Sequence, residues 1–70
     1  MIEAERVSRI QRLKFNKKLI NRIVIVSEFG RTWKGKITNV IDHETFQIEN
    51  QTDKDRAVST VDIYQICRVI

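Results

Sequence analysis

Basic side chains are the most prominent charged groups of this sequence, and most of them lie in its first half. Residues 1–36 carry ten Lys/Arg and three Glu, a net charge of +7, whereas residues 37–70 carry three Lys/Arg and six Asp/Glu, a net charge of −3. The first half should therefore attract polyanions to one face or rim of the molecule. A solvated basic face without a ligand is the alternative. The residues concerned are Arg6, Arg9, Arg12, Lys14, Lys17 and Lys18.

The residue types needed for catalysis or metal binding are scarce. His43, the only histidine, lies between Asp42 and Glu44, and Cys67 is the only cysteine. Hydrolysis would need a nucleophile beside a base, or two carboxylates in distinct environments. No spacing of Cys and His suits a metal. We therefore expect a protein that is not an enzyme and has no cofactor, no metal site and no small-molecule substrate, with Cys67 as a small packed side chain.

Two of the five aromatic residues could stack on nucleic-acid bases. Trp33 and Tyr64 could form a platform for a single strand. For Trp33 we favour the alternative that it covers the end of a barrel or an interface. Phe15, Phe29 and Phe46 are expected in the core or in contacts that staple elements together.

The elements that would position these residues begin with a helix. Apolar residues recur at intervals of three to five over residues 2–13, as in an amphipathic helix. Glutamates lie in its first turn and arginines towards its end. Such a short helix is marginal alone, so its apolar stripe should dock on the protein rather than anchor in a membrane. Residues 14–21 lose this period and are expected to form a basic linker.

From residue 22 onward the pattern is that of short β-strands. We expect strands at 22–28, 31–41, 45–49, 56–60 and 64–69, with turns at 29–30 and 42–44, a polar loop at 50–55 and one helical turn at 61–63. Gly35 should mark a bend or bulge in the second strand. Five short strands with brief connections indicate a closed or nearly closed antiparallel barrel.

The small size of the chain suggests oligomerisation. Seventy residues make one domain whose core contributes only a few kcal/mol of net stability. A disulfide cannot supplement it, because there is a single cysteine. The apolar fifth strand would be an aggregation hazard at a free edge. Pairing with the fourth strand of a neighbouring copy would remove the hazard and could close a ring.

Several positions resemble the Sm and Sm-like family, which includes Hfq-like proteins. The residues concerned are Ile23, Ile25, Gly30, Gly35, Ile37, Val40, Phe46 and Ile48, and a second set at relative positions zero, five and eight, Val58, Ile63 and Ile66. The resemblance covers residues 20–70. It implies a mainly β fold: an N-terminal α-helix (1–14) followed by a five-stranded, strongly bent antiparallel barrel (20–70), together a single domain over residues 1–70. It also implies a homo-oligomeric ring that binds RNA.

The loops depart from the family's pattern. Counted from Gly35, the family's Asp falls at Ile41, whereas the acid is Asp42. Thr45 and Glu44 replace an Asn and a stacking side chain, and Ser59-Thr60 replace a basic pair. His43 is either a solvated loop residue or a side chain that stacks on a base. We expect weak, low-specificity RNA binding by loops near the pore, made of Asp42, His43, Glu44, Thr45, Ser59 and Thr60.

The sequence therefore predicts a cytoplasmic ring of about five to eight subunits that binds single-stranded RNA, in line with the resemblance. The alternative is an oligomeric adaptor that binds a protein or peptide without recognising specific RNA. Duplex DNA binding by charge is a third, weaker hypothesis. The first residues lack the apolar run of a signal peptide, and no segment has the length of a membrane span.

Overall fold

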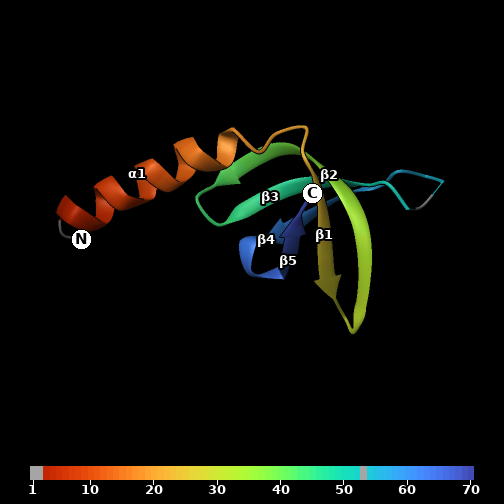
Figure 1. Ribbon diagram of the computed structural model, residues 1–70. Helices are drawn as coiled ribbons and strands as arrows, with labels where there is room; N and C mark the ends of the chain where they lie inside the picture. Colours follow the sequence, from red (N-terminus) through yellow and green to blue (C-terminus); the bar gives the residue numbers. More distant parts are fainter. Residues whose placement is uncertain (1–2, 53) are drawn as a thin grey trace.

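The protein is one N-terminal helix followed by a five-stranded antiparallel sheet (Figure 1). The computed structural model describes residues 3–52 and 54–70, with side chains from Ser8 onward. The elements are α1 (Glu3–Lys17), β1 (Ile23–Glu28), β2 (Arg31–Asp42), β3 (Thr45–Asn50), β4 (Val58–Asp62), the 3-10 turn η1 (Ile63–Gln65) and β5 (Ile66–Val69). The mainly β architecture predicted from the sequence is thus confirmed.

The long strand β2 gives the sheet its curvature. Its first half pairs with β1, from Arg31 opposite Glu28, and its second half pairs with β3, up to Asp42 opposite Thr45. The register with β3 shifts between Ile37 and Asn39 and again before Asp42. Such irregularities bend a strand and increase its twist, and Figure 1 shows β2 as a long arc.

The sheet is open in the single chain. The strand order is β4-β3-β2-β1-β5, so β4 and β5 form its two edges and, within the described residues, make no ladder with each other. Of the closed or nearly closed barrel expected from the sequence, the closed form is therefore not made by one copy. A sheet of five short strands whose ends do not meet keeps unpaired backbone groups along both edges.

Gly35 lies where β2 packs tightly against a side chain of β3. A Cβ atom at this position would collide with Ile48 Cγ2 and lie 2.7 Å from Trp33 Cζ3. The predicted bulge is therefore misplaced. Gly35 pairs regularly with Val24 and with Asn50, and the register shift begins two residues later. Without a side chain at Gly35, β2 and β3 can lie close together at this position, and their register does not shift there.

The core is a layer of aliphatic side chains around one phenylalanine. The buried residues come from all strands except β5: Val24, Val26, Ile37, Val40, Phe46, Ile48 and Val61. Partly buried side chains, among them Leu13 of α1, Trp33 and Ile66, pack against this layer. Leu13, near the end of the helix, therefore docks on the sheet, whereas Ile10 of the same predicted stripe is 47% exposed, so the expected docking of the whole stripe is not confirmed.

Several boundaries differ from the sequence-based expectation. Helix α1 continues to Lys17 instead of ending at 14, because Asn16, one turn after Leu13, is buried at the same contact. Strand β4 starts at Val58 and η1 starts at Ile63, each two residues later than predicted. The reason is that Val61 pairs with Phe46 inside the core, which keeps the chain extended through Asp62.

The turn between β1 and β2 has the predicted residues. Phe29 and Gly30 both have positive φ, 52° and 73°. This is the geometry of the two-residue turns that match strand twist in hairpins. Among the described residues, no helix is long and apolar enough to cross a membrane.

Candidate nucleic-acid interface

Helix α1 is tied to the turn between β2 and β3 by one buried side chain. Asn16 is 3% exposed, and its Nδ2 donates to the backbone oxygen of His43 over 2.9 Å. An amide buried in this way positions the helix because it has to keep its partner. The rest of α1 extends beyond the sheet (Figure 1).

The turn itself is held by Asp42. Its Oδ1 accepts the backbone N–H of Glu44 over 2.9 Å, an Asx-type turn. This hydrogen bond, together with one from the Thr45 side chain, lowers the pKa of Asp42 below its ordinary value, since both favour the ionised form. The carboxylate of Asp42 is therefore ionised at neutral pH and already accepts the hydrogen bonds that hold the turn.

Glu44 is the meeting point of three elements. Its Oε1 lies 3.8 Å from Arg12 Nη1 of α1, 3.5 Å from His43 Nε2 and 3.5 Å from the hydroxyl oxygen of Tyr64 in η1. Its backbone oxygen accepts the N–H of Ile63 over 2.7 Å. The carboxylate of Glu44 alone would repel phosphates. The structure adds that Arg12 stands beside it and offsets part of its charge.

These contacts form a small cationic depression between α1 and the turn. It has a volume of about 250 Å³ and is lined by Ser8, Arg9, Arg12, His43 and Glu44. Two guanidinium groups, a hydroxyl and an imidazole are donors that suit an oxyanion such as phosphate. The carboxylate of Glu44 competes for the same donors.

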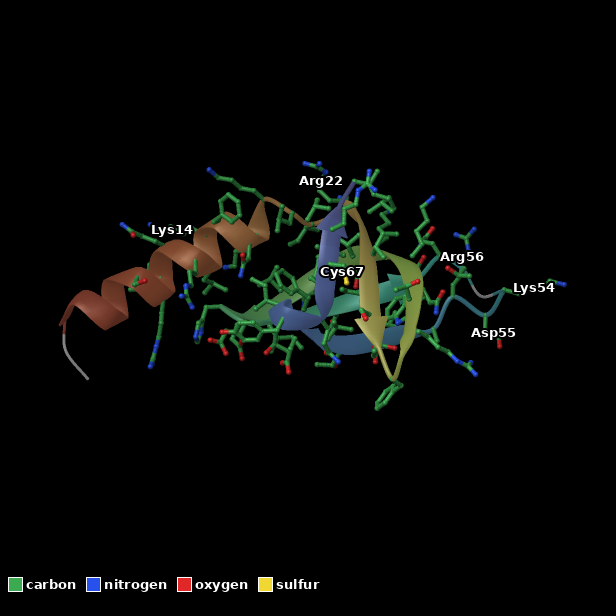
Figure 2. The ribbon with its side chains drawn as sticks, turned by 60° about the horizontal axis from the view of Figure 1, so that its bottom comes forward. Lys14, Arg22, Lys54, Asp55, Arg56 and Cys67 are labelled. Atoms are coloured by element: carbon green, nitrogen blue, oxygen red, sulfur yellow. The ribbon has the colours of Figure 1, made fainter. Side chains whose placement is uncertain are left out.

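The other predicted basic residues lie outside this depression. Lys14, Lys17 and Lys18 are exposed on α1 and just after it, and Lys14 points away from the sheet in Figure 2. The side chain of Arg6 lies outside the described part of the structure, although its backbone belongs to α1. Lys54 and Arg56 lie at the end of the molecule opposite α1 (Figure 2).

The prediction that Ser59 and Thr60 belong to a loop beside this turn is wrong. Both lie inside β4, where they pair with Ile48 and Gln47. The connection between β4 and β5 is instead η1, whose entry is held by a hydrogen bond from the Asp62 N–H to Gln65 Oε1, 3.0 Å long. The turn residues that reach the β2–β3 turn are therefore Ile63 and Tyr64.

The aromatic residues follow the expectation only in part. Phe46 is buried, and Trp33 is half-buried against the core, as a cover at a barrel end would be. Phe15 and Phe29 are 62% and 96% exposed, so the prediction that they are core residues is wrong. Phe15 falls outside the stripe of Leu13 and Asn16, and Phe29 sits in the turn before Gly30. Both positions could have been recognised from the helical period and the turn signal.

Exposed Phe15 and Tyr64 border a second, mostly apolar groove. It lies between α1 and η1, has a volume of about 540 Å³ and is lined by Ser8, Gln11, Arg12, Phe15, Asn16, Ile63 and Tyr64. Arg12 and Ser8 line both hollows, so the cationic depression and the apolar groove lie on either side of Arg12. A ligand that carries an anionic group next to an apolar group could occupy both hollows.

Among the described residues, no group of three His, Cys, Asp or Glu side chains is placed to hold a metal ion. No protein-family model, curated protein or solved structure matches this chain. Function therefore has to be argued from the residues and their geometry.

Proposed function

We propose that this protein is a non-catalytic, Sm-like RNA-binding protein that works in the cytoplasm as a homo-oligomeric ring of about five to eight copies. The observation that carries the RNA part is the cationic depression, where Arg9, Arg12 and His43 converge beside exposed aromatic side chains. Phosphate contacts supply most of the affinity of such sites, and bases add stacking energy.

The two free sheet edges support the ring. Ile70 N–H donates to Ile23 O over 2.8 Å, and Arg68 stands opposite Ile25. Antiparallel ladders alternate, so the N–H of Arg68 faces β1 and that of Val69 faces outward. Pairing this outward edge with β4 of a neighbour is a head-to-tail contact, which closes when the rotation per copy divides a full turn.

The spacing of apolar residues around η1 also favours the Sm-like interpretation. Val61, Ile66 and Val69 repeat the relative positions zero, five and eight that the sequence offered at Val58, Ile63 and Ile66. Val61 is fully buried, whereas Val58 is 55% exposed. When the spacing is counted from Val61, the turn η1 lies between its first two positions, and its apolar positions lie on β4 and β5.

Single-stranded RNA fits these surfaces better than a duplex. Phe15 and Tyr64 expose most of their side chains next to Arg12, and a base can stack on them only when it is unpaired. A ring would present the basic helix once per copy, so weak single contacts would add through multivalency.

The apolar groove favours a second candidate, an adaptor that binds a peptide. A hydrophobic side chain could occupy the groove while acidic neighbours meet the basic helix. The two functions differ in their response to salt, because phosphate contacts release counterions and an apolar groove does not.

A polynucleotide binding assay tests the proposal. We expect oligo-U and oligo-A to bind in fluorescence anisotropy with a steep fall of log affinity against log salt. Reversing Arg9 and Arg12 to Glu should weaken both RNAs and flatten that slope. Reversing Lys54 and Arg56, at the far end of the molecule, is the matched control and should change neither. Equal effects of the two double variants would mean that the helix is a solvated basic face without a specific role in RNA binding. A complete lack of RNA binding would favour the adaptor.

A further inference from the structure

The side chain at the tip of the β1–β2 hairpin is unusual for its position. Phe29 is 96% exposed and adopts a φ of 52°, a left-handed conformation that bulky residues rarely take. Two-residue hairpin turns prefer Asn, Asp or Gly there. The chain therefore carries a large apolar side chain at some cost, and nothing in its own fold covers it.

The apolar groove between α1 and η1 offers the complementary shape. Its helical wall is one stripe, Ser8, Gln11, Arg12 and Phe15, with the spacing of residues that share a face. Ile63 and Tyr64 form the facing wall, and Tyr64 is 79% exposed. The volume of about 540 Å³ leaves room for a phenyl ring between these side chains.

Charges around the two surfaces are complementary as well. Glu28 and Arg31 flank Phe29 and stand opposite each other at the end of the hairpin. Arg12 lines the groove, and Glu44 lies beside both Arg12 and Tyr64 at its border. A hairpin entering the groove can therefore place Glu28 near Arg12 and Arg31 near Glu44.

We propose that the groove between α1 and η1 receives Phe29 of a second copy of this chain. The contact joins two different surfaces, so it is heterologous and can propagate from one assembly to the next. It is distinct from the edge pairing of β4 and β5. One aromatic side chain and two exposed ion pairs make a contact far smaller than a standard interface. The inference therefore rests on the proposed ring, in which several such contacts act together.

Sedimentation velocity over a concentration series tests this self-association. The unmodified chain should form species heavier than one ring, in increasing amount as concentration rises. Phe29→Asn removes the aromatic side chain and keeps a residue that tolerates positive φ, so the variant should fold and sediment as single rings over at least a tenfold wider range of concentration. Ile41→Asn, a change at another half-exposed apolar residue, is the control and should behave as the unmodified chain.

Charge reversal across the contact gives a second, independent test. Glu28→Arg and Arg12→Glu should each weaken the heavier species, and the double variant should restore them. Absence of rescue, or heavy species that persist in Phe29→Asn, would overturn the proposal.

Two further outcomes distinguish the docking of Phe29 from ring formation and from contacts of Phe29 with RNA or a membrane. A chain that sediments as a monomer at all concentrations would contradict both the ring and the docking of Phe29, whereas rings that never associate would contradict the docking alone. Phe29→Asn could also lower affinity for oligo-U, or for vesicles with anionic lipid, without changing self-association. Phe29 would then be an RNA or membrane contact, and the inference would be wrong.

Discussion

The amide of Asn16 sets the position of the basic helix relative to the turn that carries His43 and Glu44. It is the buried polar side chain of the described structure, and it joins residues 27 positions apart in the sequence. Asn16→Ala should lower the free energy of unfolding by about 1–3 kcal/mol, because the partly buried carbonyl of His43 would lose its donor. Urea denaturation measures this. Lys14→Ala, an exposed change on the same helix, should stay within about 0.5 kcal/mol.

The second prediction at this scale concerns the acid stability of the β2–β3 turn. The pKa of Asp42 is lowered by its hydrogen bonds to Glu44 and Thr45. A depressed pKa stabilises the folded state above the ordinary value near 4, and this contribution is lost as pH falls through the folded pKa. NMR titration of the Asp42 carboxyl carbon should give a midpoint below that of an unstructured Asp. Asp42→Asn should remove the corresponding part of the pH dependence, and an unshifted midpoint would contradict the hydrogen-bonded turn.

In the proposed RNA complex, Glu44 would compete with RNA for the donors of the cationic depression. Glu44→Gln removes one negative charge per copy and keeps a side chain of the same shape, so it should tighten binding of a short oligonucleotide at low salt. The gain should shrink as salt rises, because exposed charges are screened. Anisotropy titrations at two salt concentrations measure it. Glu49→Gln, on the outer part of β3 near Arg56, is the control. Weaker binding by Glu44→Gln would mean that the carboxylate itself contacts the ligand.

At the scale of elements, the sequence predicted the strands better than what joins them. The alternating β-branched residues of β1 and the Phe29-Gly30 turn are local signals, and both are confirmed. The end of α1 and the start of η1 depend on the burial of Asn16 and Val61 by residues far along the chain. Local periodicity contains no such information. Residue type placed Ser59 and Thr60 in a predicted strand, the family resemblance placed them in a loop near the pore, and the structure has them in β4.

The candidate site was also only partly predictable from the sequence. Arg9, Arg12, His43 and Glu44 were identified from residue type, and the structure places them together. The role of Tyr64 beside Glu44 depends on how η1 folds back onto the β2–β3 turn, which no sequence period reports. Open edges at the fourth and fifth strands were expected from the sequence, and the strand order has β4 and β5 at the two edges of the sheet.

The tight packing of β2 against β3 at Gly35 provides a prediction for the sheet. Gly35→Ala should lower the free energy of unfolding by about 1–3 kcal/mol, because the added methyl group meets Ile48 and the ring of Trp33. Gly30→Asn is the control: the turn has a positive φ that Asn tolerates, and no atom lies within 4 Å of the added Cβ. Thermal or urea unfolding compares the two. Equal losses would contradict the packing role of Gly35, because its φ is not positive and its backbone conformation is open to alanine.

At the scale of the whole molecule, the open sheet of the single chain is consistent with the proposed ring. The single chain leaves β4 and β5 unpaired with each other and projects α1 beyond the sheet (Figure 1). Its basic helix lies at one end and the loop with Lys54, Asp55 and Arg56 at the other (Figure 2). A ring would pair the edges and repeat the basic helix around one face.

The most direct test of the ring is the mass of the protein in solution, measured by light scattering after size-exclusion chromatography at low micromolar concentration. The proposal predicts one species of about five to eight copies. Val69→Pro, which removes an N–H that faces away from β1, should convert it to monomers with the fold retained, whereas Val69→Thr should leave the ring intact. A monodisperse monomer of the unmodified chain, or a ring that survives Val69→Pro, would contradict assembly through these edges.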